Sequence, residues 1–169
     1  MSGKFDNRKK NSFIQSRPES SVETSGVSEK CKFNFHYFTD DQGAGQSFSD
    51  WNNGAGSVSL LQLISKLKNY SESPLSYWEA QRVGGGGLKV LEIYGSFPKK
   101  SDFTHPPHVP HDVLWARFRL ASKVRLIGFL IPKELHNVEC NTSRSRFDAN
   151  TFYIVFLDKN HLFYKTEKN

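Results

Sequence analysis

The chain of 169 residues suits one domain with a tail, and its hydrophobic share of 37%, with 14 Phe, is enough for a substantial core. It has no apolar run of the roughly 20 residues that a bilayer crossing needs, and its early positive charges precede no apolar segment. Two cysteines without CxxC spacing exclude a disulfide framework. These features predict a cytoplasmic protein with no membrane association, and the net charge of +6 permits a polyanionic partner.

Residues 1–30 form a serine-rich, weakly basic segment with few apolar side chains. Such a segment cannot bury enough surface to offset the entropy lost on ordering, so we expect a disordered tail. A basic arm that contacts nucleic acid is the alternative interpretation. Residues 31–169 are then expected to form a single α+β domain.

The domain is expected to open with a strand, because residues 32–39 alternate between apolar and polar side chains. A long polar loop with several glycines follows over residues 40–56. We expect Phe48 and Trp51 to hold this loop to the domain, since they are its large apolar side chains.

Two helices are expected after the loop. Ser57 has the character of an N-cap for a helix that ends near Tyr70, and Ser73-Pro74 begins a second, short helix that ends near Gln81. The side chains predicted to form the buried stripe of the first helix are Leu60, Leu61, Ile64 and Leu67. The run Gly84–Gly87 predicts a flexible turn, because no Lys-Ser/Thr follows it and no strand precedes it, as a phosphate loop would require.

The second half of the chain is rich in strands. The expected strands are residues 88–94, 113–120, 124–131 and 151–157, with a last short strand at 161–165. The order β-α-α-β-β-β-β predicts an antiparallel sheet of about five strands with two helices packed on one side.

The two strands at 113–120 and 124–131 are expected to form a hairpin with a basic face. A three-residue loop, Ala121–Lys123, keeps the apolar faces together and sets Arg119 opposite Arg125. Arg117 and Trp115 share the face of Arg119 because side chains alternate along a strand.

Like charges placed directly opposite each other on a sheet are unfavourable. One explanation is that neighbouring carboxylates, such as Glu92 or Asp158, pair with the arginines. The other is a polyanion on this face, with arginines on phosphates and with Trp115 and Tyr153 stacked on bases. The sequence leaves both explanations open.

Histidines supply the candidate acid–base groups. His105, His108 and His111 recur every third residue in a proline-rich segment, which in a polyproline II helix would place their rings about 9 Å apart, too far to share one ion. Only a tight turn at Pro106-Pro107 would bring two of them together, so a proline-rich connector or a rigid loop is favoured over a zinc site. No metal or other cofactor is predicted. His111, His136 and His161 remain candidate proton-transfer groups, with His111 and His161 preferred, although each is also compatible with a structural role.

The hairpin 115–131 with Arg117, Arg119 and Arg125, together with the strand 151–157 and His161, Tyr164 and Lys165 beyond it, resembles the RelE/ParE-type toxin fold. That resemblance implies a strand, two helices and an antiparallel sheet with arginines on its face. It also implies metal-independent cleavage of messenger RNA by Arg, Lys, His or Tyr side chains of that face, in some members, and a protein antitoxin as a partner. Tyr164 becomes a candidate catalytic residue on this basis.

The sequence therefore predicts a protein that binds nucleic acid, with RNA preferred, through Arg117, Arg119, Arg125, Trp115 and Tyr153. Cleavage would use His161, His111 and Tyr164, without metal. The alternative is a non-enzymatic module that binds a protein partner through the aromatic-rich sheet edge and the loop 40–56.

Overall fold

The computed structural model describes residues 8–17 and 20–165. Its helices are α1 (Arg8–Gln15), α2 (Phe48–Asn52), α3 (Leu60–Tyr70) and α4 (Leu75–Ala80), with short 3-10 helices at Val27–Glu29, Gly56–Val58 and Lys133–Leu135. Its strands are β1 (Lys32–Asn34), β2 (Arg82–Val83), β3 (Leu88–Lys89), β4 (Leu91–Gly95), β5 (Leu114–Arg119), β6 (Arg125–Leu130) and β7 (Thr151–Asp158). The α+β class is confirmed, and the detailed order differs from the predicted one by α1, α2 and the small β2–β3 pair.

Five strands form the main sheet, in the order β1-β7-β6-β5-β4. The strands from β4 to β7 are antiparallel neighbours, whereas β1 runs parallel to β7 at the edge. The prediction of a wholly antiparallel sheet was therefore wrong at β1. No hairpin joins β1 to its neighbour, so chain connectivity does not fix the direction of this strand.

Strand β1 is also shorter than predicted, since it ends at Asn34 rather than at residue 39. The Asn34 side chain accepts a hydrogen bond from the backbone N–H of His36 at 2.9 Å. This local bond turns the chain away from the sheet, as Asn side chains commonly do. The loop that follows contains α2, and Trp51 within it is fully buried, as predicted.

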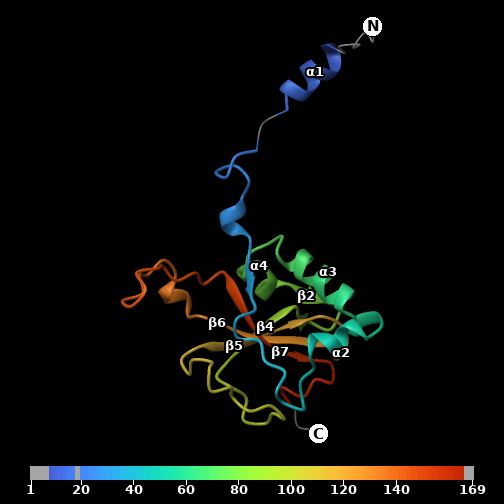
Figure 1. Cartoon of the computed structure of the whole chain (residues 1–169), viewed down its shortest axis with the longest axis vertical. Coiled ribbons are helices and arrows are strands. Elements are labelled where there is room, and N and C mark those ends of the chain that lie inside the picture. The colour runs from blue at the N-terminus through green and yellow to red at the C-terminus, as the bar shows by residue number, and fades with distance from the viewer. Residues whose placement is uncertain (1–7, 18–19, 166–169) are drawn as a thin grey trace.

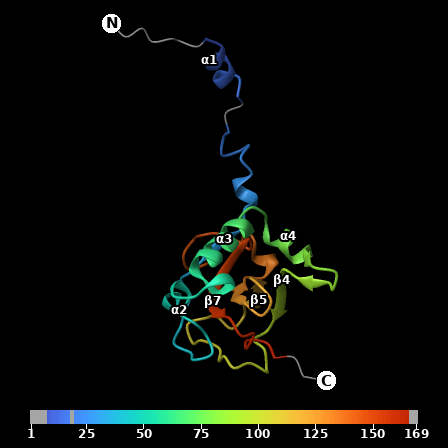
Figure 2. The same ribbon diagram turned by 90° about the vertical axis from the view of Figure 1, so that its right-hand side faces the viewer.

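Helices α2, α3 and α4 all contribute to the core on one face of the sheet (Figures 1 and 2). The predicted buried stripe of α3 was partly wrong, because Leu61 and Ile64 are exposed by 74% and 53%. The buried residues are Leu63, Leu67 and Tyr70. The Tyr70 ring stacks on Phe118 at 4.4 Å and its hydroxyl donates to the Arg119 carbonyl, which fixes the rotation of the helix.

The opposite face of the sheet carries a second core that no helix covers. Segments 96–113 and 161–165 lie over it, with Phe103, Val109 and Phe163 buried against Trp115 and Phe156. Figure 1 shows the first of these segments as the yellow loops below the sheet. The part of this face around Trp115 and Phe156 is therefore packed under irregular chain.

The predicted strand at 161–165 is not formed, because the Asp158 side chain holds the chain in a turn. Its two carboxylate oxygens accept hydrogen bonds from the backbone N–H groups of Asn160, Leu162 and Phe163 at 2.9 to 3.1 Å. This arrangement brings His161 to a positive φ of 61° and sends Phe163 into the core.

The hairpin has the predicted register. Phe118 lies opposite Leu126 and Arg119 lies opposite Arg125, around a loop closed by the hydrogen bond from the Leu120 N–H to the Val124 carbonyl at 3.0 Å. The expectation of a three-residue loop is confirmed. Strand β7 is buried on both faces, as expected of an inner strand.

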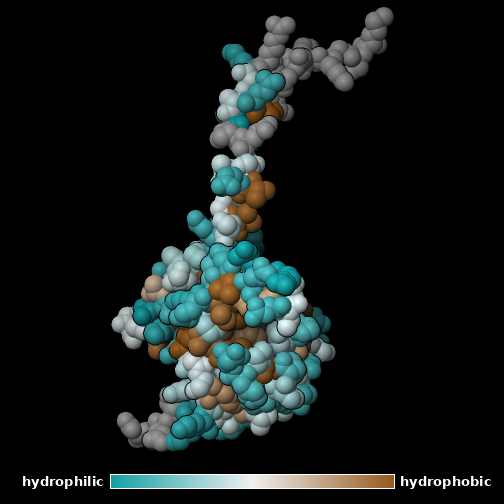
Figure 3. Space-filling model, turned by 90° about the vertical axis from the view of Figure 1, so that its left-hand side faces the viewer, coloured by the Kyte–Doolittle hydropathy of each residue, from teal (hydrophilic) through white to brown (hydrophobic). Residues whose placement is uncertain are grey.

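The N-terminal segment leaves the domain and carries helix α1, where a disordered tail was expected (Figure 1). Residues 1–7 and 18–19 of the expected tail lie outside the described residues. Apolar side chains are exposed along this segment, among them Phe13, Ile14, Val22 and Val27. Figure 3 shows brown, hydrophobic atoms on the part of the chain that extends from the domain. No helix in the described part of the chain has the length and apolar content that a bilayer crossing requires.

Candidate anion-binding pocket

Five of the eight side chains predicted to form a functional site line one pocket of about 290 Å³. The pocket lies on the face of the sheet opposite the helices, where strands β4, β5 and β6 meet the segment that follows β7. We call it the arginine pocket, and its lining residues are Leu88, Glu92, Tyr94, Arg117, Arg119, Arg125, His161 and Tyr164.

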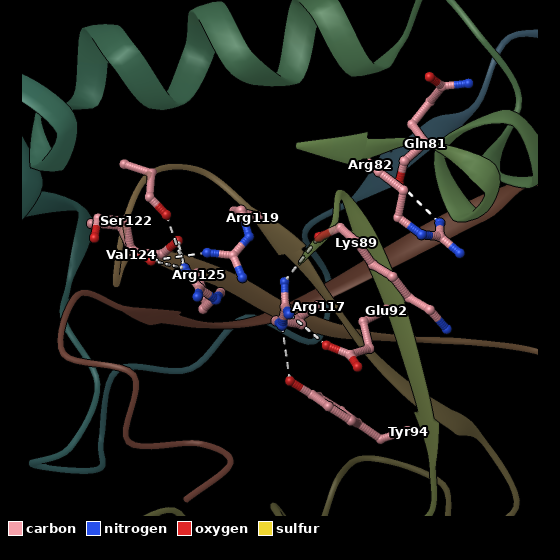
Figure 4. Close-up of polar contacts among 11 residues, drawn as sticks. Gln81, Arg82, Lys89, Glu92, Tyr94, Arg117, Arg119, Ser122, Val124 and Arg125 are labelled. Carbon is pink, nitrogen blue, oxygen red and sulfur yellow. Dashed lines mark hydrogen bonds and ion pairs between the residues drawn. The ribbon is translucent and has the colours of Figure 1, made fainter. Parts of the chain in front are cut away.

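Arg117 is the arginine with a full set of partners. Its guanidinium donates to the Tyr94 hydroxyl at 3.0 Å and forms an ion pair with Glu92 at 2.5 Å, while Nη1 reaches the Lys89 carbonyl at 3.4 Å (Figure 4). The side chain is only 4% exposed. For this residue the expected pairing with Glu92 is confirmed, and it leaves little capacity for a ligand.

Arg125 is equally buried but lacks a carboxylate partner among the described residues. Its Nη1 donates to the carbonyls of Ala121, Ser122 and Val124 at 2.9 to 3.0 Å, which fastens the hairpin loop. Its Nε is buried without a hydrogen-bond partner. Burial and the charges of Arg117 and Arg119 lower the pKa of Arg125 to about 10.

Arg119 lies directly opposite Arg125 and repeats this pattern. Its Nη1 donates to the Ser122 carbonyl at 3.0 Å, and its Nε is also buried without a partner. Burial, and after it the charge of Arg117, lowers the pKa of this half-buried side chain. Figure 4 shows Arg119 and Arg125 side by side near the hairpin loop, apart from the Arg117–Glu92 pair.

Asp158, the other carboxylate expected to neutralise the arginines, is opposite Arg125 in the register of β6 and β7. It is fully buried, and both of its oxygens are engaged by the backbone N–H groups described above. No ion pair joins it to Arg125 among the described residues. The pair of Arg119 and Arg125 is therefore left with donors that no acceptor in the described part of the chain uses.

His161 and Tyr164 close the pocket from the C-terminal segment. Burial, and after it the charge of Arg125, lowers the pKa of His161 below its usual value of 6.5, so the ring is neutral at pH 7. Tyr164 stacks on Tyr94 at 4.8 Å with nearly parallel rings, and it is 40% exposed. The pocket thus combines three guanidiniums, a neutral imidazole and an accessible aromatic ring.

The other three predicted residues lie elsewhere. Trp115 is 1% exposed in the core under the 96–113 segment, so it has no free ring face for a base, which corrects the prediction that it stacks on nucleic acid. Tyr153 lies at the other end of the sheet, where it stacks on Phe129 at 4.8 Å. His111 is exposed on the 96–113 segment and does not line the pocket.

The histidine segment is more compact than a polyproline II helix would be. A turn closed by the hydrogen bond from the Val109 N–H to the Pro106 carbonyl stacks the rings of His105 and His111 at 4.4 Å. His108 instead lies within 3.1 Å of the Tyr37 carbonyl. The described residues contain no group of three or more His, Cys, Asp or Glu side chains arranged to hold a metal ion.

Sequence reasoning missed Tyr94 as a component of the site. Tyr94 follows Glu92 by two residues on β4, so the two side chains lie on the same face of the sheet. Glu92 lies opposite Arg117 in the register of β4 and β5. The alternation of side chains along β4 indicates that Tyr94 and Glu92 share a face. It does not indicate that this face meets Arg117 until the pairing of β4 with β5 is known.

The arrangement favours an anion that enters the pocket beside Arg119 and Arg125, since buried cationic donors without acceptors bind oxyanions strongly. An oxyanion held there would also lie within the pocket that His161 and Tyr164 line. Comparison of the chain with protein-family models, with curated proteins and with solved structures gives no match.

Proposed function

We propose that the protein binds nucleic acid, with RNA preferred, through phosphate groups held in the arginine pocket. The observation that carries this proposal is the pair of opposed arginines, Arg119 and Arg125, whose buried Nε groups have no partner among the described residues. An unused charged donor in a buried site costs roughly 1–3 kcal/mol or more. A phosphate oxygen would satisfy such donors and would neutralise the like charges.

Metal-independent cleavage of the bound strand is the enzymatic form of this proposal. His161 is neutral at pH 7 and can therefore take a proton from a ribose hydroxyl, while the arginines stabilise the charge that develops on the phosphate. Tyr164, on the same pocket, can donate a proton to the leaving oxygen. The resemblance to RelE/ParE-type toxins motivates the proposal of cleavage. It also motivates the proposal of a protein antitoxin as partner and of a cytoplasmic location.

A second candidate, a module that binds a protein partner, is favoured by a different pocket. Between α4, β4 and the segment after β6 lies a cavity of about 310 Å³ with mostly apolar walls, formed by Leu75, Leu91, Ile93, Leu114, Leu130 and Ile131. An apolar interface at this place would bind with little dependence on salt, whereas phosphate contacts release counterions and weaken steeply as salt rises.

The test is a measurement of affinity for single-stranded RNA and DNA oligonucleotides across a salt series. Arg119→Gln removes one half-buried charge of the pocket, and Arg144→Gln removes one exposed charge that pairs with Glu139 outside it. We expect Arg119→Gln to weaken RNA binding by about ten-fold and to lower the salt slope by about one, while Arg144→Gln changes neither.

Circular dichroism and thermal unfolding of each variant control for loss of the fold. Equal weakening by both variants would assign binding to general charge and not to the pocket. No binding by the wild-type protein at low salt would overturn the proposal and would move attention to the apolar cavity.

A further inference from the structure

The geometry points to a phosphate monoester, such as the phosphorylated end of a strand or a free nucleotide, as the group that the arginine pocket recognises. This inference rests on the proposed function. It states that the pocket binds one terminal phosphate and not the phosphates along a nucleic-acid backbone. Three features of the pocket carry it.

The first feature is size. Side chains from β3, β4, β5, β6 and the segment after β7 line the pocket, whose volume of about 290 Å³ is at the lower limit of small-ligand sites. A phosphate inside a strand needs room for a nucleotide on each side of it. A terminal phosphate needs only one exit, which such a pocket provides.

The second feature is charge. Among the described residues that line the pocket, three guanidiniums and one carboxylate, Glu92, leave a net charge of +2 when His161 is neutral. A phosphate monoester carries about −1.5 to −2 at pH 7, and a diester carries only one charge. Asp158 lies outside the lining, and its buried charge opposes that of Arg125, so the balance is +1 when Asp158 is counted. The charge of the lining alone, which a ligand meets directly, is the one that matches a monoester.

The third feature is the position of donors and rings. The described hydrogen bonds of Arg119 and Arg125 all use Nη1, and the Nε of each is buried, so the Nη2 group of each guanidinium is the donor that remains for a ligand with several oxygens. Arg125 is 4% exposed, so a group that reaches it must enter deeply. Tyr164, 40% exposed at the same pocket, offers a ring on which the attached nucleoside can stack.

The experiment compares the affinities of the wild-type full chain for four probes. Three are the same short RNA sequence with a 5′-phosphate, with a 3′-phosphate or with hydroxyls at both ends, and the fourth is uridine monophosphate, with uridine as its control. We expect a phosphorylated end to raise affinity by about ten-fold or more. Inorganic phosphate should compete, and Arg119→Gln should remove the difference between probes, whereas Arg144→Gln should keep it.

The outcomes separate this inference from the proposed function. Equal affinity for all three RNAs, with weakening in Arg119→Gln, would overturn monoester recognition and leave nucleic-acid binding intact. Binding of uridine monophosphate through Arg119, without binding of any RNA, would uphold monoester recognition and overturn the nucleic-acid function. Absence of binding to all four probes would overturn both, and because these comparisons use the wild-type chain they do not depend on a variant's folding.

Discussion

Arg119 and Arg125 differ from ordinary basic surface residues in one respect: their buried Nε groups have no acceptor among the described residues. Exposed arginines contribute little to stability or to binding, because water competes for their donors. Arg117 is also a buried arginine, but its guanidinium has protein partners, the Glu92 carboxylate and the Tyr94 hydroxyl. The contrast between these neighbours on β5 is the reason for assigning the ligand to the Arg119–Arg125 side of the pocket.

The titration of His161 is expected to make the stability of the protein depend on pH. Its pKa is lowered in the folded chain, first by burial, then by the charge of Arg125, with Arg117 and Arg119 adding to the effect and Asp158 opposing it. The unfolded chain therefore binds the proton more readily, so stability present above about pH 6.5 is lost as the pH falls through and below that value.

We expect the free energy of unfolding of the wild-type chain to fall more steeply between about pH 7 and pH 5 than that of His161→Asn. Asn is the matched replacement because it tolerates the positive φ of 61° at this position. Urea denaturation at several pH values measures this difference. Parallel pH profiles for the two proteins would show that His161 keeps its ordinary pKa in the folded state.

At the scale of elements, α3 shows which contacts orient a helix. Apolar residues lie on more than one side of this helix, so its sequence admits two buried stripes. Packing of Tyr70 on Phe118 selects the stripe that contains Leu63 and Leu67 and leaves Leu61 in solvent.

Two matched substitutions on α3 test that orientation. Leu63 is 1% exposed and Leu61 is 74% exposed, so Leu63→Ala should lower the free energy of unfolding by about 2–5 kcal/mol and Leu61→Ala by less than about 0.5 kcal/mol. Thermal or urea unfolding of the two variants provides the measurement. A larger loss for Leu61→Ala than for Leu63→Ala would mean that the other stripe faces the sheet.

The strands show which features of the fold sequence patterns can predict and which they cannot. Alternation and loop length predicted the hairpin and its Arg119–Arg125 register because both are local properties of one short segment. The direction of β1 depends on its partner β7, which is distant in sequence. The failed strand at 161–165 depends on the Asp158 side chain, whose hydrogen bonds compete with the sheet ladder.

For the site as well, local patterns predicted some residues, whereas contacts between distant segments could not be predicted. Arg117, Arg119, Arg125, His161 and Tyr164 were found from pattern and resemblance, and the pocket brings them together. Trp115 was misjudged because the strand pattern indicates a shared face but cannot show that the 96–113 segment covers part of that face. Its burial turns a predicted stacking ring into a core residue.

In the molecule as a whole, hydrogen bonds to the domain begin at Glu29, two residues before the predicted boundary at residue 31. The Asn150 side chain donates to the Glu29 carbonyl, Lys30 donates to the Glu72 carbonyl, and the Cys31 N–H donates to the Ser73 carbonyl. These contacts tie the chain to the domain from Glu29 onward, while α1 lies away from it (Figure 1).

Removal of residues 1–26 should therefore leave the melting temperature unchanged, whereas removal of residues 1–31 should lower it because buried Cys31 and these hydrogen bonds are lost. Thermal unfolding followed by circular dichroism compares the two truncations. A large loss of stability in the shorter truncation would show that the N-terminal segment belongs to the folded unit.

The most direct measurement of the central claim is nitrogen-15 NMR of the arginine side chains during titration with a short RNA. Signals are assigned with single Arg→Lys variants. We expect the Nε–H signals of Arg119 and Arg125 to shift as RNA is added, while those of exposed Arg144 and Arg146 stay in place. Shifts confined to the exposed arginines, or no shift at saturating RNA, would contradict the assignment of the arginine pocket as a phosphate site.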